Sequence, residues 1–228
     1  MTFTEPDFLS TSCFIVLCFA IVLVFLRSVY KVDKKILHVA FPLFLWLGLF
    51  SNAVYLGLIS SNIPKNIIMA FTASNLVALM IGFSPVGRRL SKNISIKSLI
   101  AFQMFRLPLE LILHYWAQQE SIPQTMTWTG YNFDIITGII AVTGYFLVDH
   151  YRWVAWFVNI IGFALLVNVA RVAMMSSPLS FAWNVIPPLQ LLFHLPYALI
   201  VPICVSGALA GHIILTRALL RRKPAKDS

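Results

Sequence analysis

The chain has 228 residues, of which 59% are hydrophobic and only 11% are charged, and its mean hydropathy is +0.84. Soluble domains contain about 45–50% apolar and about 25% charged residues, so this composition excludes a soluble domain. The formal charge of +9 does not indicate a nucleic-acid partner, because the basic residues occupy short segments between long apolar runs. Those runs predict an all-α membrane protein, folded as a single domain over residues 1–228, and exclude a barrel of short alternating strands.

The first apolar run follows a segment with two acidic residues, Glu5 and Asp7, and no basic residue. A cleaved signal peptide begins with a positively charged region, so we expect this run to be a retained membrane span. Seven spans are predicted, over 8–26, 36–58, 66–83, 98–116, 132–148, 153–174 and 188–216. The last exceeds the roughly 20 residues that cross a bilayer, and Pro196 and Pro202 are expected to break or kink it.

The distribution of basic residues predicts the orientation of the bundle. All but three of the 17 fall in the segments 27–35, 88–97 and 152 and in a basic tail over 217–228. The exceptions are Lys65, in an outer connection, and Arg106 and Arg171, inside spans. Because cytoplasmic segments are enriched in Lys and Arg, the N-terminus is predicted outside and the C-terminus in the cytoplasm. The surrounding lipid bilayer is the expected partner.

Polar residues inside the spans are the candidate functional residues. Arg106, Glu110 and His114 recur every four residues, which places them along one stripe of a helix. The topology sets Arg106 near mid-membrane and the other two closer to the outside. Further polar residues fall at the outer level of three other spans: Asn132, Asp134, Asn168, Arg171 and His194. We expect these groups to line one polar chamber that opens to the outside.

Each candidate also has a structural explanation. An unpaired arginine at mid-membrane costs about 2.5–3.5 kcal/mol, so Arg106 should form an ion pair, either with Glu110 on the next turn or with another span. Asp134 falls in the first turn of its span, where a carboxylate suits the positive helix end and Asn132 can cap it, and this interpretation is preferred. Arg171 and His114 lie close enough to the interface to reach water.

The second half of the chain resembles a known family. Arg-Leu-Pro-Leu-Glu-Leu (106–111) and Ile-Pro-Gln-Thr-Met-Thr-Trp-Thr-Gly-Tyr-Asn-Phe-Asp-Ile-Ile-Thr-Gly (122–138) are similar to a family of bacterial multi-span integral membrane proteins, uncharacterised in function. Its members read R-x-P-x-E, then P-x-x-M-T, then G-x-N-F-D-I-x-x-G. The resemblance implies a location in the inner (plasma) membrane and implies no activity.

Three functions are compatible with these residues. The leading hypothesis is an outward-facing intramembrane pocket that binds or transports a small solute or ion, with Arg106 and Glu110 at its base. The second is a non-catalytic subunit or sensor whose polar residues only hold helices together. The third, an intramembrane enzyme, is less favoured, because no catalytic spacing, metal-ligand spacing or cofactor motif is present.

Overall fold

The structure is a computed structural model that describes residues 3–34 and 36–221. The described residues form helices and connections, without a strand. The α-helices are α1 (Phe8–Val32), α2 (Leu37–Tyr55), α3 (Ile63–Phe83), α4 (Pro85–Asn93), α5 (Ile96–Phe102), α6 (Arg106–Gln118), α7 (Ile135–Leu147), α8 (Trp153–Ser176) and α9 (Ser206–Arg221). Lys35 of the predicted first cytoplasmic segment, and residues 222–228 of the predicted basic tail, lie outside the described residues.

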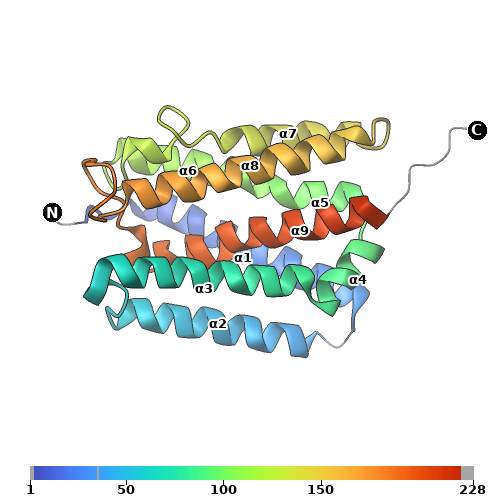
Figure 1. Cartoon of the computed structure of the whole chain (residues 1–228), viewed down its shortest axis with the longest axis horizontal. Helices are drawn as coiled ribbons and strands as arrows, with labels where there is room; N and C mark the ends of the chain where they lie inside the picture. Colours follow the sequence, from blue (N-terminus) through green and yellow to red (C-terminus); the bar gives the residue numbers. More distant parts are fainter. Residues whose placement is uncertain (1–2, 35, 222–228) are drawn as a thin grey trace, which may run out of the picture.

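The long helices run side by side along the longest axis of the molecule (Figure 1). One end, here called the loop end, carries the start of α1 and the connections α2–α3, α6–α7 and α8–α9. The other, here called the basic end, carries the α1–α2 connection, α4, the α7–α8 turn and the end of α9. The described basic residues outside the spans lie at the basic end, except Lys65.

Within residues 3–34 and 36–221, five helical segments are long and apolar enough to cross a membrane: Phe8–Val32, Leu37–Tyr55, Ser60–Phe83, Trp153–Ser176 and Tyr197–Arg221. The other two predicted spans are less regular. The fourth is divided into α5 and α6 by a 3-10 turn over Gln103–Phe105, and the fifth is α7, an apolar helix of 13 residues. At 1.5 Å per residue, α7 is about 20 Å long and is shorter than a bilayer core.

Prolines explain the irregular backbone. Pro108 has no N–H to donate toward Met104, which fits the 3-10 turn that separates α5 from α6. The predicted break near Pro196 and Pro202 is confirmed: a 3-10 turn over Tyr197–Leu199 is followed by a π-helical segment over Ile200–Val205, and regular helix begins only at Ser206. The helical segment before α6 and the helical segment before α9 are therefore both interrupted.

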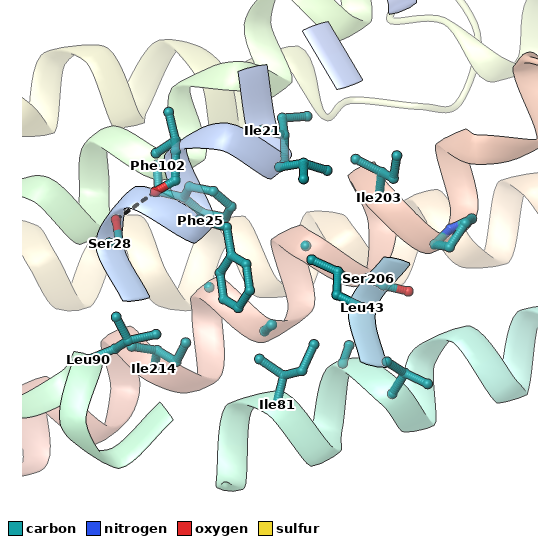
Figure 2. Close-up of a pocket in the computed structure, with 18 of the residues that line it drawn as sticks. Ile21, Phe25, Ser28, Leu43, Ile81, Leu90, Phe102, Ile203, Ser206 and Ile214 are labelled. Atoms are coloured by element: carbon teal, nitrogen blue, oxygen red, sulfur yellow. Dashed lines mark hydrogen bonds between the residues drawn. The ribbon is translucent and has the colours of Figure 1, made fainter. Parts of the chain in front are cut away.

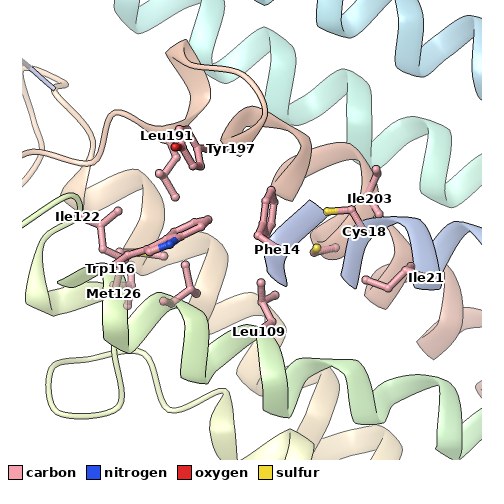
Figure 3. Close-up of a cluster of buried hydrophobic side chains, with 13 residues drawn as sticks. Phe14, Cys18, Ile21, Leu109, Trp116, Ile122, Met126, Leu191, Tyr197 and Ile203 are labelled. Atoms are coloured by element: carbon pink, nitrogen blue, oxygen red, sulfur yellow. The ribbon is translucent and has the colours of Figure 1, made fainter. Parts of the chain in front are cut away.

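The core near the loop end is built around aromatic rings (Figure 3). Phe14 of α1 and Tyr197 both meet the Trp116 ring edge-on, with centroids 5.2 Å away in each case. Trp116 is fully buried, and its indole N–H donates to the Ser10 hydroxyl at 3.0 Å. This polar contact is what a buried tryptophan requires, and it fixes α6 against α1.

The connection between α6 and α7 folds into the bundle instead of lying on its surface. Ser121, Ile122, Met126, Thr127 and Asn132 are all at least nine-tenths buried. Irregular backbone at membrane depth is tolerated where protein surrounds it or where it lines a cavity. This inward path, together with the late start of α7, brings the end of the connection to the side chains of α6.

Candidate functional site

The centre of the site is a buried ion pair between α6 and the start of α7. Arg106 is 1% exposed and Asp134 is 4% exposed. The Nε–H of Arg106 donates to Oδ2 of Asp134 at 2.5 Å, and its Nη2–H donates to Oδ1 of the same carboxylate. The pair is thus bidentate, which is the strongest geometry for guanidinium and carboxylate. Thr137 adds a hydroxyl donor to Oδ1 at 2.9 Å.

The remaining donors of Arg106 extend the pair to two more helices. Its Nη1 donates to the Gly162 carbonyl of α8 at 2.9 Å and lies 3.0 Å from Nε2 of His212 on α9. Because guanidinium only donates, Nε2 of His212 must accept. The other ring nitrogen, Nδ1, then carries the proton and donates to Oδ1 of Asn159 at 3.0 Å. Arg106 therefore binds a neutral histidine in one defined tautomer.

The hydrogen-bond chain continues one step toward the basic end. Nδ2 of Asn159 donates to the Thr216 hydroxyl at 2.7 Å, and that hydroxyl donates to the His212 carbonyl at 2.8 Å. Each group has a compatible donor or acceptor role, so the network from Asp134 to Thr216 is satisfied throughout. A satisfied buried network fixes a single arrangement of helices, because any displacement leaves a polar group unpaired.

Glu110 stands beside this network with a different partner. Both of its oxygens accept from Nδ2 of Asn132, at 2.9 and 3.0 Å, and Asn132 also bonds the Met126 carbonyl and the Asp134 backbone N–H. Glu110 is 1% exposed, yet among the described residues it forms no ion pair. A buried carboxylate without a cation is costly, so Glu110 requires either a proton or a cation.

A cavity of about 80 Å³ borders these acidic groups. Arg106, Glu110 and Asp134 contribute to its wall, and the rest is mainly apolar side chains of α3, α6, α8 and residues 189–208. Since one water needs about 10–15 Å³ of such volume, there is room for several waters or a small solute. Within the described residues no three His, Cys, Asp or Glu side chains are grouped to hold a metal ion.

The other predicted site residues lie outside this cluster. His114 is half-buried and stacks on Trp128, with ring centroids 4.1 Å apart. His194 stacks on Phe3 at the same centroid distance. Arg171 is exposed and bonds Asn168, whose amide in turn donates to the Tyr131 carbonyl. The predicted chamber therefore joins Arg106, Glu110, Asn132 and Asp134, and not His114, His194, Asn168 or Arg171.

Of the two partners expected for Arg106, the structure selects the one on another span. Arg106 pairs with Asp134 on α7 and not with Glu110 on its own helix, because the inward path of residues 119–134 delivers Asp134 to the guanidinium. The preferred interpretation, which explained Asp134 by its place at the helix end alone, is incomplete, because its carboxylate makes no capping hydrogen bond and pairs with Arg106. Asn132 does accept the Asp134 N–H at 3.2 Å, so the turn that opens α7 is stabilised as expected.

Sequence reasoning missed Asn159, His212 and Thr216, as well as the Gly162 carbonyl. His212 falls four residues before the end of the predicted span 188–216, but α9 continues to Arg221, which places His212 about 14 Å from the helix end. Two features of the sequence could have indicated these residues: Asn159 interrupts an otherwise apolar run, and His212 and Thr216 are four residues apart and so share one helix face. Gly162 is required because a β-carbon there would lie 2.7 Å from Cε1 of His212.

Chemically, the arrangement contains one ion pair, Arg106 with Asp134, and one acid, Glu110, that forms no ion pair with a described residue. It can therefore hold a proton or a small cation against Glu110 without disturbing the ion pair.

Comparisons with known proteins found no relative: no family model, no curated protein and no solved structure matches the chain.

Proposed function

We propose that the chain is a seven-span integral membrane protein with its N-terminus outside and its basic end in the cytoplasm. In this proposal α5 and α6 form one interrupted span, and α7 crosses together with the inward-folded connection before it. The basic residues at one end support this orientation, because cytoplasmic segments carry the excess of Lys and Arg (Figure 1). The start of α1 and the end of α9 lie at opposite ends, as an odd number of spans requires.

The proposed function is to bind or transport a small solute or ion in the cavity beside Glu110. The observation that carries it is a carboxylate 1% exposed, without an ion-pair partner in the described chain, on the wall of an 80 Å³ cavity. Ionisable groups inside a membrane are expensive and are usually retained for ion pathways, proton relays or ligands. In the proposed topology the cavity lies in the outer half of the bundle.

The charge of the ligand follows from the donors of Arg106. Its guanidinium is already occupied by Asp134, Gly162 and His212, so an anion would have to displace a bidentate carboxylate. Glu110 has only the amide of Asn132. A proton, a small inorganic cation or a small protonated amine therefore fits the cavity better than an anion does.

A thermal-stability screen tests this function. Purified protein in detergent is titrated with alkali cations and with small alkylammonium ions, beside Glu110→Gln and the control His114→Gln outside the cluster. A ligand that binds the folded state at 100 times its Kd should stabilise it by about 2.7 kcal/mol. We expect saturable stabilisation in the wild type and in His114→Gln and none in Glu110→Gln. Equal stabilisation in all three would refute the role of Glu110.

One observation favours the second candidate, a purely structural role. The chain of bonds from Asp134 through Arg106, His212 and Asn159 to Thr216 is fully satisfied, as a helix-locking network should be. Two kinds of variant distinguish the structural role from the binding role. Replacing both members of the ion pair changes stability under either role, whereas Glu110→Gln preserves shape and removes only the ionisable group. Loss of ligand response with unchanged stability supports binding.

Membership of the bacterial family that the second half resembles is part of the same proposal. It would place the protein in the inner (plasma) membrane, with the bilayer as partner. Fractionation of cells that express the tagged chain from its native host checks this, because the protein should be recovered with inner-membrane markers and released only by detergent.

A further inference from the structure

A second pocket lies on the opposite side of α9 from the ion pair and is almost entirely apolar (Figure 2). Its volume is about 100 Å³, and it is enclosed by α1, α2, α3, α5 and α9 with Leu90 of α4. Figure 2 shows Leu90 and Ile214 together at one end and Ile203 and Ser206 at the other. The helix that covers it, α2, packs weakly, since only Phe50 and Val54 of its 19 residues are buried.

Three arginines, Arg88, Arg217 and Arg221, lie near one another beyond the basic end of this pocket. Arg217 of α9 donates to the Gly82 carbonyl and lies 3.4 Å from the Ser84 carbonyl. Arg221, one turn further, lies 3.4 Å from the Arg88 carbonyl. Within the described chain none of these three arginines forms an ion pair with a carboxylate. Arg88 and Arg221 lie close enough to Arg217 to act on it electrostatically, so the three arginines make one patch of positive charge, here called the arginine cluster.

The pocket and the arginine cluster are continuous. Ala210 and Ile214 of α9 line the pocket, and Arg217 and Arg221 continue the same helical stripe toward the basic end. On α3, Ile81 lines the pocket, and the carbonyl of the next residue, Gly82, accepts from Arg217. One apolar slot thus leads directly to one cationic patch.

The length of the slot matches one leaflet. Ser206 and Arg217 are separated by about 16 Å along α9 at 1.5 Å per residue, and half of the hydrocarbon core measures about 15 Å. We propose that this site binds one anionic phospholipid, with its phosphate against the arginine cluster and one acyl chain in the pocket. Arginine suits the phosphate, because its planar fork donates two hydrogen bonds to it. The proposal shares only the membrane placement with the proposed function and does not involve the Glu110 cavity.

Native mass spectrometry of the full chain in neutral detergent tests the site. The probes are phosphatidylglycerol, phosphatidylcholine with the same chains, and glycerol phosphate, which has the anion without chains. We expect one tightly retained phosphatidylglycerol and much weaker retention of the other two. Arg217→Gln combined with Arg221→Gln should weaken phosphatidylglycerol retention about 25-fold, from roughly fivefold per charge near a membrane surface. Arg152→Gln, on the α7–α8 turn at the same end, should leave it unchanged.

A second variant tests the chain-binding part without touching the arginines. At Gly207 a β-carbon meets only Ile21 and Phe102, at 3.7 and 3.9 Å, so Gly207→Leu can fit and fill the pocket. It should reduce phosphatidylglycerol retention and leave the weak binding of glycerol phosphate as it was. If the arginine double variant does not fold, this variant decides alone. Equal retention of the two lipids, competition by glycerol phosphate as strong as that of the lipid, or full retention by Gly207→Leu would each overturn the proposal.

Discussion

Replacement of Arg106 and Asp134, singly and together, tests whether their pair is the structural centre of the bundle. The changes are Arg106→Leu, Asp134→Leu and the double variant. Breaking a buried pair by removing one partner costs about 3–5 kcal/mol, whereas replacing both can be nearly neutral. Arg106→Leu should be the worst of the three, because it leaves Asp134 and Glu110 as two carboxylates in one cluster without the guanidinium.

The double variant should recover most, though not all, of the lost stability. Without Arg106, Nε2 of His212 has no donor. An unpaired buried acceptor costs about 1–3 kcal/mol, so a deficit of that size should persist. Lower pH should partly rescue Arg106→Leu, because a proton can neutralise a stranded carboxylate, and should not rescue Asp134→Leu, whose stranded group is a guanidinium.

Unfolding by denaturant in detergent, followed by circular dichroism, measures these differences. Arg171→Leu is the matched control, since Arg171 is an exposed arginine on α8 and an exposed contact is worth at most about 1 kcal/mol. A double variant as unstable as the sum of the single variants would refute the pairing, because independent sites add and coupled sites do not. Single variants as stable as Arg171→Leu would refute the burial argument as well.

Three further predictions concern the packing, the helix cap and the topology. Gly162→Ala should destabilise the protein by about 1–3 kcal/mol in the same unfolding assay, since the new β-carbon would lie 2.7 Å from His212. The control Gly48→Ala, whose β-carbon would have no atom within 4 Å, should be neutral or mildly stabilising. Equal effects of the two variants would exclude close packing at Gly162. Hydrogen bonds from the backbone N–H of Ser10 and then from the Gln119 amide lower the pKa of Asp7. The ionised Asp7 side chain therefore stabilises the folded protein above its unfolded pKa of about 3.9, and this stabilisation is lost as the pH falls through the lower folded pKa. Melting temperatures between pH 7 and 2 should therefore fall less steeply in acid for Asp7→Asn than for the wild type, and identical slopes would contradict this. Reporter fusions after Lys35, Lys97, Arg152 and the C-terminus should report cytoplasm, and those near Ser61, Gln124 and Ser177 should report the outside; a C-terminus outside would contradict the orientation.

The apolar runs and the prolines were sufficient to predict where the long helices lie and where the last one breaks. Helix formation depends on local sequence, and a missing N–H at Pro202 acts on the four residues before it. The four-residue spacing also predicted that Arg106 and Glu110 lie on one face of α6, and both are buried in the same cluster.

The partners of these groups were not predictable, because they depend on a connection that folds inward. No local pattern in residues 119–134 predicts that Asn132 and Asp134 are buried against α6 and not exposed at the membrane surface. The same holds for His212, which falls near the end of the predicted span 188–216, whereas α9 continues to Arg221 and leaves His212 well inside the helix. Local patterns set the elements, whereas the site depends on contacts between distant segments.

In the proposed topology, the shortness of α7 has a consequence for the membrane around it. α1 is about 37 Å long and α7 about 20 Å, and α7 exposes Ile136, Ile139 and Phe146 along its outer face. Irregular backbone does not face hydrocarbon, so the polar surface of the bilayer should descend to the start of α7 on that side. We expect the bilayer to be thinned locally there, at a modest cost per ångström. Such a depression would bring bulk water closer to Asp134 than the thickness of an undisturbed membrane allows.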